Sequence, residues 1–237
     1  HLKFLKKTGT AIFLRINRDQ IWVCIIAKVP ASWHKKRMAA ATKKLKVIIF
    51  LGSSREGRLG ERVSKFCKNY LEKTNHEVTV FDPIELDLPL LKKPLHFYKD
   101  LSEAPKKLKD CNDQIKAADA FLFVSCEYNH CIPPALANMV DHFPCSSFAW
   151  RPSGIVTYSP GIYGGVRCST QLRTLTGELG CISVSNMFGI PQVHNAIDEN
   201  GKPLNDQMET GMKRLMSQLD WMAWAMKNQK EKHGIPM

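Results

Sequence analysis

Apolar and polar residues alternate along this chain in blocks that predict strands and helices in turn. The clearest block is a continuous apolar run over residues 47–51, followed by an amphipathic segment over residues 61–71. A continuous apolar run is typical of a buried strand, and apolar positions three and four residues apart are typical of a helix. Further strands are expected over residues 76–81, 120–125, 153–159 and 181–185, with helices over 104–118, from Pro134 onward, over 170–179 and over 207–229.

The order of these blocks indicates the fold class. Alternating strands and helices predict an α/β domain, a doubly wound five-stranded parallel sheet with helices on both faces. In such sheets ligands bind beyond the carboxyl ends of the strands. Three loops at those ends are rich in glycine, hydroxyl or amide groups: residues 52–60, 127–131 and 160–165. We expect these loops to meet in one crevice.

The loop over residues 52–60 has the features of a phosphate site. Its backbone N–H groups, the start of the next helix and Arg55 all attract an anion. A dinucleotide fingerprint is absent, because two serines follow the first glycine. A triphosphate loop is also absent, because Arg58 and Leu59 stand where lysine and a hydroxyl residue are required. A single terminal phosphate, as on a flavin mononucleotide, is therefore the best fit.

The net charge of +12 is concentrated at the beginning of the chain. Residues 1–46 carry 12 Lys/Arg and one acid, whereas residues 47–237 carry 22 Lys/Arg and 21 Asp/Glu, a net charge of +1. A nearly neutral main domain gives no basis for nucleic-acid binding. We expect a basic extension over residues 1–37 and one folded domain over residues 38–237.

Two interpretations of residues 1–37 remain open. Their basic bias resembles a mitochondrial transit segment, although serine is nearly absent. Alternatively, Met38 is the true start and the preceding residues are upstream sequence. The apolar stretches of the extension are too short and too broken for a membrane helix. The eight cysteines form no C-x-x-C pair, which favours reduced thiols, so we predict a cytoplasmic protein or, with a real transit segment, a mitochondrial one.

Three motifs together resemble the NADPH-dependent FMN reductase family. They are Gly-Ser-x-Arg at residues 52–55, Glu-Tyr-Asn at 127–129 with a Leu-x-Asn-x-x-Asp helix at 136–141, and Ser-x-Gly-x-x-Gly-Gly at 159–165 before Gln-Leu-Arg. The resemblance covers residues 45–225 approximately. Two positions depart from the family pattern: Cys126 replaces a usual proline, and Ala137 replaces a usual lysine.

The resemblance implies a flavodoxin-like oxidoreductase that contains FMN. It would pass a hydride from NADPH, or NADH, to FMN and on to a quinone, azo, flavin or metal acceptor by a ping-pong mechanism. It also implies a homodimer. Two alternative functions remain open: a flavodoxin-type electron carrier and a flavin redox-sensing binding protein. The near-neutral charge argues against the carrier, because carriers usually dock through an acidic face.

The candidate site residues come from all three loops. No catalytic side chain and no metal ligand is expected, because the chemistry belongs to the flavin. Arg58 is almost equally well explained by a surface ion pair. The residues expected to bind the cofactor are Ser53, Arg55, Arg58, Gly60, Glu127, Tyr128, Asn129, Ser159, Gly161, Tyr163, Gly164 and Gly165.

Overall fold

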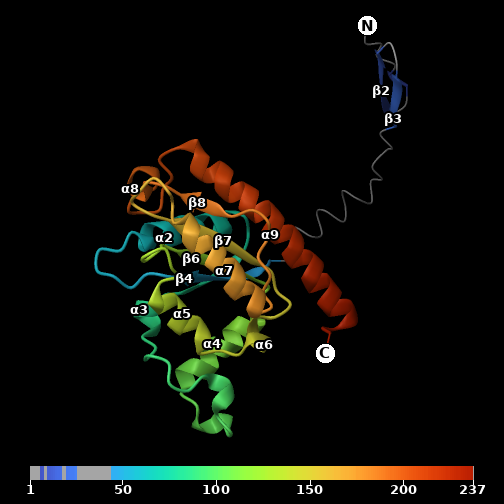
Figure 1. Ribbon diagram of the computed structural model, residues 1–237. Helices are drawn as coiled ribbons and strands as arrows, with labels where there is room; N and C mark the ends of the chain where they lie inside the picture. Colours follow the sequence, from blue (N-terminus) through green and yellow to red (C-terminus); the bar gives the residue numbers. More distant parts are fainter. Residues whose placement is uncertain (1–5, 8–9, 18–19, 26–43, 237) are drawn as a thin grey trace. The chain divides into compact units, whose positions relative to one another are not determined.

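A five-stranded, all-parallel sheet forms the centre of residues 44–236 (Figure 1). The computed structural model describes residues 6–7, 10–17, 20–25 and 44–236. The strands lie in the order β5-β4-β6-β7-β8, which is the flavodoxin-like order. The predicted fold class is therefore confirmed. The strands are β4 (Lys46–Leu51), β5 (Glu77–Phe81), β6 (Ala120–Ser125), β7 (Ser153–Tyr158) and β8 (Phe188–Ile190).

Helices cover both faces of this sheet. One face packs against α2 (Gly60–Lys73) and α9 (Asp206–His233), and the other packs against α4 (Lys106–Ala117), α5 (Pro134–Asp141) and α7 (Val166–Glu178). Shorter helical segments lie in the connections: α3 (Pro83–Leu86), α6 (Cys145–Phe148), α8 (Val193–Ala196), and the 3-10 turns Leu95–Phe97 and Leu101–Glu103.

The continuous apolar runs are explained by burial on both sides of the sheet. In β4, Val47, Ile49 and Leu51 join the core under α2 and α9, whereas Ile48 and Phe50 join the core on the opposite face. All five side chains are at most 3% exposed. Because helices cover both faces of this strand, neither face needs polar residues, and apolar and polar residues do not alternate along it.

The fifth strand lies later in the chain than the sequence predicts. Residues 181–185 were expected to form it, but the paired strand is β8, and Ser183 makes only an isolated bridge to Ser153. The guanidinium of Arg173 donates to the carbonyl oxygens of Val184 and Ser185. Those acceptors are therefore occupied by a side chain from α7, and regular strand pairing begins only after them.

Residues His1–Lys43 form a first, separate unit of the chain. It contains an antiparallel sheet in the order β1-β2-β3, formed by β1 (Lys6–Lys7), β2 (Thr10–Asn17) and β3 (Gln20–Ile25). The predicted boundary between residues 37 and 38 lies outside the described residues. In the part of the chain that the structure describes, no helix is long and apolar enough to cross a membrane.

Candidate functional site

The loops that follow β4, β6 and β7 lie side by side at the carboxyl edge of the sheet. Ser53 Oγ in the first loop lies 2.8 Å from Tyr128 Oη in the second. The carboxylate of Glu127 in the second loop accepts from the backbone N–H groups of Arg167 and Cys168, at 3.1 and 3.3 Å, where α7 starts after the third loop. One connected surface is thus built from three separate segments.

In the first loop, Arg55 is stacked on Tyr128 but keeps its donors free. The guanidinium carbon lies 3.6 Å from the centre of the Tyr128 ring. Within the described residues its N–H groups make no hydrogen bond. A stacked guanidinium still presents its N–H edge in the ring plane, so Arg55 is able to bind an anion without leaving Tyr128. Ser53 lies beside this pair and is only 3% exposed.

Arg58 has a different position from the other candidates of this loop. Its side chain is 6% exposed and pairs with the carboxylate of Asp82 at 2.7 and 2.5 Å. It also donates to the carbonyl oxygen of Ser53 at 2.6 Å and to Glu61 at 3.2 Å. All of these partners belong to the protein itself, so the Arg58 guanidinium holds the loop in its shape.

A buried tyrosine hydroxyl lies directly under the helix start. Gly60 is the first residue of α2, and a Cβ atom built on it would lie 2.3 Å from Tyr158 Oη. Tyr158 is 2% exposed, and its hydroxyl has no hydrogen-bond partner within the described residues. Burial, with the nearby Cys126 thiol adding to it, raises the pKa of Tyr158. The protonated hydroxyl is a donor without an acceptor at the floor of the loop.

The second loop is a tight two-residue turn. Tyr128 and Cys131 exchange backbone hydrogen bonds of 3.1 and 2.9 Å. The two central residues, Asn129 and His130, have φ angles of 51° and 65°. Positive φ at both central positions defines a type I′ turn, in which asparagine is favoured. The turn exposes Asn129 and holds Tyr128 at its base, half-buried.

The third loop needs two of its glycines for backbone reasons. Gly164 and Gly165 have φ angles of 61° and 72°, and a Cβ atom on Gly165 would lie 2.9 Å from the carbonyl oxygen of Tyr158. Gly161 is under no such constraint, because its nearest neighbour would lie 3.9 Å away. Ser159 donates its hydroxyl to the Gly161 carbonyl oxygen at 3.0 Å. Tyr163 is 59% exposed, so an aromatic face borders the crevice.

Helix α7 starts at Val166, four residues before the predicted start, because its cap comes from elsewhere in the chain. Glu127 fills that N-terminus, and its carboxylate also pairs with the Arg167 guanidinium at 3.3 Å. An anion already occupies this helix end. Helix α2, in contrast, has no side-chain cap, so its start is available to a ligand phosphate.

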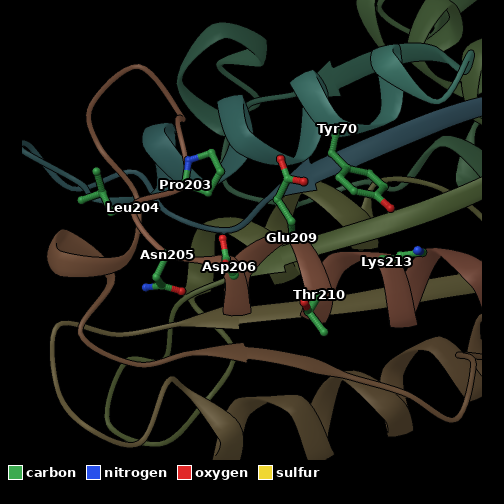
Figure 2. A pocket seen from close by; sticks show the side chains of 8 residues that line it. All are labelled: Tyr70, Pro203, Leu204, Asn205, Asp206, Glu209, Thr210 and Lys213. Atoms are coloured by element: carbon green, nitrogen blue, oxygen red, sulfur yellow. The ribbon is translucent and has the colours of Figure 1, made fainter.

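A separate hollow lies away from these loops. A cavity of about 540 Å³ is bounded by α2, the loop before α9 and the first turns of α9. Tyr70 from α2 and Glu209 from α9 reach into it (Figure 2). No residue of the three loops lines it. The described residues also contain no cluster of His, Cys, Asp or Glu suited to a metal ion. The candidate site is therefore the surface of the three loops.

Comparison with known proteins agrees with this geometry. The family model for NADPH-dependent FMN reductase matches residues 45–195, which contain all three loops. The chain belongs to this family. It is thus an NAD(P)H-dependent oxidoreductase with FMN as its cofactor, as the sequence motifs predicted.

Individual relatives support the same assignment. A quinone reductase of Escherichia coli is 28% identical over 172 residues, which cover 70% of this chain and 88% of that protein. An FMN-dependent NADPH-azoreductase of Staphylococcus saprophyticus is 28% identical over 59% of this chain and 73% of its own length. The structure of FerB, a flavoenzyme NAD(P)H:(acceptor) oxidoreductase from Paracoccus denitrificans, superposes with a TM-score of 0.65 at 22% identity, covering 81% of this chain and all of that one. This structural likeness confirms the fold.

Sequence reasoning missed three residues of the site: Asp82, Tyr158 and Arg167. Each acts on a loop that is distant in sequence, so no local spacing identifies it. Of these three, only Asp82 has a recognisable sequence context, because an acid directly after a strand often caps the following helical turn. Its carboxylate does accept from the Ile84 backbone N–H at 2.9 Å. Tyr158 reads as an ordinary strand residue until Gly60 is placed against it.

Proposed function

We propose that this chain holds FMN in the three-loop crevice and uses it to reduce a small-molecule acceptor with NADPH or NADH. The observation that supports this most is the set of unused donors around the first loop: the Tyr158 hydroxyl, the Arg55 guanidinium and the uncapped start of α2. A terminal phosphate supplies the acceptors that all three lack. The donor set therefore fits FMN.

Each loop has its own part in the proposed complex. Ser53, Arg55 and Tyr158 bind the phosphate, with Gly60 leaving room for the Tyr158 hydroxyl beneath the start of α2. Tyr128 and Asn129 border the ring on one side, and the backbone of Gly164 and Gly165 borders it on the other. When bound, FMN accepts a hydride from the reduced nicotinamide and delivers two electrons to the acceptor. The protein positions both reactants and limits access of water. Arg58 and Glu127 keep the loops in place.

Removal of the Arg55 guanidinium tests the phosphate assignment. A hydrogen bond to a charged group contributes about 1.5–3 kcal/mol, so Arg55→Ala should raise the FMN dissociation constant about tenfold or more. Turnover per bound flavin should be spared, because the phosphate is remote from the reacting ring. Arg214→Ala, an exposed arginine on α9, is the matched control. An Arg55→Ala protein that keeps full FMN affinity would contradict the assignment.

We propose ping-pong kinetics, because the three loops offer one crevice in which nicotinamide and acceptor must alternate. Initial rates with NADPH against a quinone should give parallel double-reciprocal lines. Tyr128→Ala should change turnover or acceptor affinity in protein that still contains FMN. Converging lines would show that both substrates bind together. Oxidation of NADPH with a small-molecule acceptor and no added protein also separates this enzyme from an electron carrier or a redox sensor.

We propose a homodimer in which α9 contributes to the contact. Trp221 on α9 is 75% exposed, an unusual position for a large aromatic side chain, and Met222 and Trp224 next to it are only partly buried. Light scattering at micromolar concentration should give twice the chain mass, and Trp221→Glu should reduce it. A fully active monomer would refute the dimer.

We propose a cytoplasmic location for the folded domain, supported by the seven cysteines of residues 44–236, all of which are free. Residues 1–37 are proposed to be dispensable for the flavin site. Deleting them should leave FMN affinity and melting temperature nearly unchanged. A deletion variant without flavin would show that they belong to the fold.

A further inference from the structure

A second concave surface lies at the opposite edge of the sheet from the three loops. Its volume is about 280 Å³. Asp119 directly precedes β6, Arg151 lies just before β7, and Lys230 comes from the last turns of α9. The flavin loops follow the carboxyl ends of the same strands. Strands of six residues rise about 3.3 Å per residue, so roughly 20 Å separates this cavity from the flavin site. The lining residues are Ala118, Asp119, Trp150, Arg151, Lys227, Lys230 and Glu231.

The cations of this cavity are only partly balanced. The Asp119 carboxylate accepts from Lys227 Nζ at 2.8 Å and from the backbone N–H of Lys46 at 2.9 Å. Arg151 is 8% exposed and gives its guanidinium to main-chain carbonyl oxygens, including that of Ala118 at 2.8 Å. Its positive charge is thus buried without a direct carboxylate partner.

Lys230 is the cation of this group that remains available. Among the described residues, its ammonium forms no ion pair and no hydrogen bond. Burial, with Arg151 and Lys227 nearby, lowers the pKa of Lys230. The three cations of the cavity outnumber its two carboxylates, Asp119 and Glu231, so the lining has a net positive charge that favours an anion. Lys230 can contact such an anion, while the buried Arg151 contributes its field.

Trp150 supplies a flat aromatic face at the rim. Its indole is 45% exposed, and its backbone has a φ angle of 64°, a left-handed conformation that costs a bulky residue free energy. A hydrogen bond of 3.1 Å from the backbone N–H of Trp150 to the carbonyl oxygen of Gly180 holds this conformation. The exposed indole gives little packing in return for the strained backbone, which is the pattern of a residue kept for contact with a ligand.

We propose that this cavity binds a nucleoside monophosphate, or a phosphate ester of similar size with a planar ring. The phosphate lies at Lys230 in the field of Arg151, and the ring stacks on Trp150. Neither the flavin nor the nicotinamide reaction requires this site. The proposal therefore stands independently of the proposed function.

AMP is the probe for the test, with inorganic phosphate and adenosine as its separate parts. Calorimetry on the full FMN-loaded chain should show one AMP per chain, with weaker binding at higher salt. Lys230→Gln should weaken AMP binding about tenfold, the value of one charge-assisted contact, without disturbing the Lys227–Asp119 pair. Lys99→Gln, an exposed lysine outside the cavity, is the matched control and should bind AMP like the unchanged protein.

Trp150→Gly separates binding from folding. Glycine accepts a φ angle of 64° without strain, so the substitution adds no backbone strain that would lower the melting temperature. AMP affinity should nevertheless fall about tenfold, the order of one base–aromatic stack, while phosphate affinity stays the same. No saturable AMP binding up to about 1 mM would refute the proposal. AMP that competes with NADPH and is unaffected by both substitutions would also refute it, because it would then lie over the flavin.

Discussion

Replacement of Tyr158 with phenylalanine should stabilise the apoprotein while weakening flavin binding. The Tyr158 hydroxyl is buried and has no partner within the described residues. A buried polar group without a hydrogen bond costs about 1–3 kcal/mol. Phenylalanine keeps the ring and its packing but lacks the hydroxyl. The free energy of unfolding of the apoprotein should therefore rise by about 1 kcal/mol, the lower end of that range.

The effect on FMN should have the opposite sign. A hydroxyl that donates to a phosphate contributes about 1.5–3 kcal/mol, so the dissociation constant of FMN should increase about tenfold in Tyr158→Phe. Urea unfolding followed by circular dichroism measures the stability of the apoprotein, and quenching of flavin fluorescence measures affinity. Tyr98→Phe is the matched control, since Tyr98 is partly buried near Lys93, away from the loops. A Tyr158→Phe apoprotein of lower stability, or one with unchanged FMN affinity, would refute the reasoning.

Three further substitutions test the framework of the fold by urea unfolding. Gly165→Ala should cost at least about 1–2 kcal/mol, because φ is 72° and the new Cβ would lie 2.9 Å from a main-chain oxygen; an unchanged midpoint would contradict this. Asp82→Asn should cost about 3 kcal/mol by removing the buried carboxylate partner of Arg58, which then keeps only the more exposed carboxylate of Glu61, and a loss below about 1 kcal/mol would place the Arg58–Asp82 pair in solvent. Burial lowers the pKa of His76, but its hydrogen bond and ion pair with Asp220 raise it above the ordinary value overall. The protonated His76 therefore contributes to the free energy of unfolding fully below about pH 6.5, and this contribution disappears as pH rises through the folded-state pKa. Asp220→Asn should lower the free energy of unfolding more at about pH 5.5 than at about pH 8.5. Equal losses at the two pH values would contradict the His76–Asp220 assignment.

The sequence predicted the parts of the fold that depend on local pattern. The apolar run over residues 47–51 is a strand because burial on both faces demands it, and the same holds for Ala120–Ser125. Residues 181–185 alternate apolar and hydroxyl side chains, which also predicts a strand, but they make only an isolated bridge at Ser183, and Arg173 from another element donates to the carbonyl oxygens of Val184 and Ser185. A local pattern does not contain that contact.

The candidate site divides in the same way. The glycines at 164 and 165 and the turn at Asn129 were recognisable, since positive φ has a clear residue preference. The partner of Arg58 was not recognisable, because Asp82 is 24 residues away and follows a different strand. Spacing identified the loops, whereas the side chains that fix those loops had to be found in three dimensions.

The Arg58–Asp82 pair also has a consequence for the rate at which flavin is captured. It joins the loop after β4 to the end of β5 and adds a hydrogen bond to the Ser53 carbonyl oxygen. These contacts hold the loop in one shape without help from a ligand, so in the proposed complex little entropy would be lost when FMN binds. Association should be a single step with a rate proportional to flavin concentration, and differences in affinity among loop variants should appear in the dissociation rate.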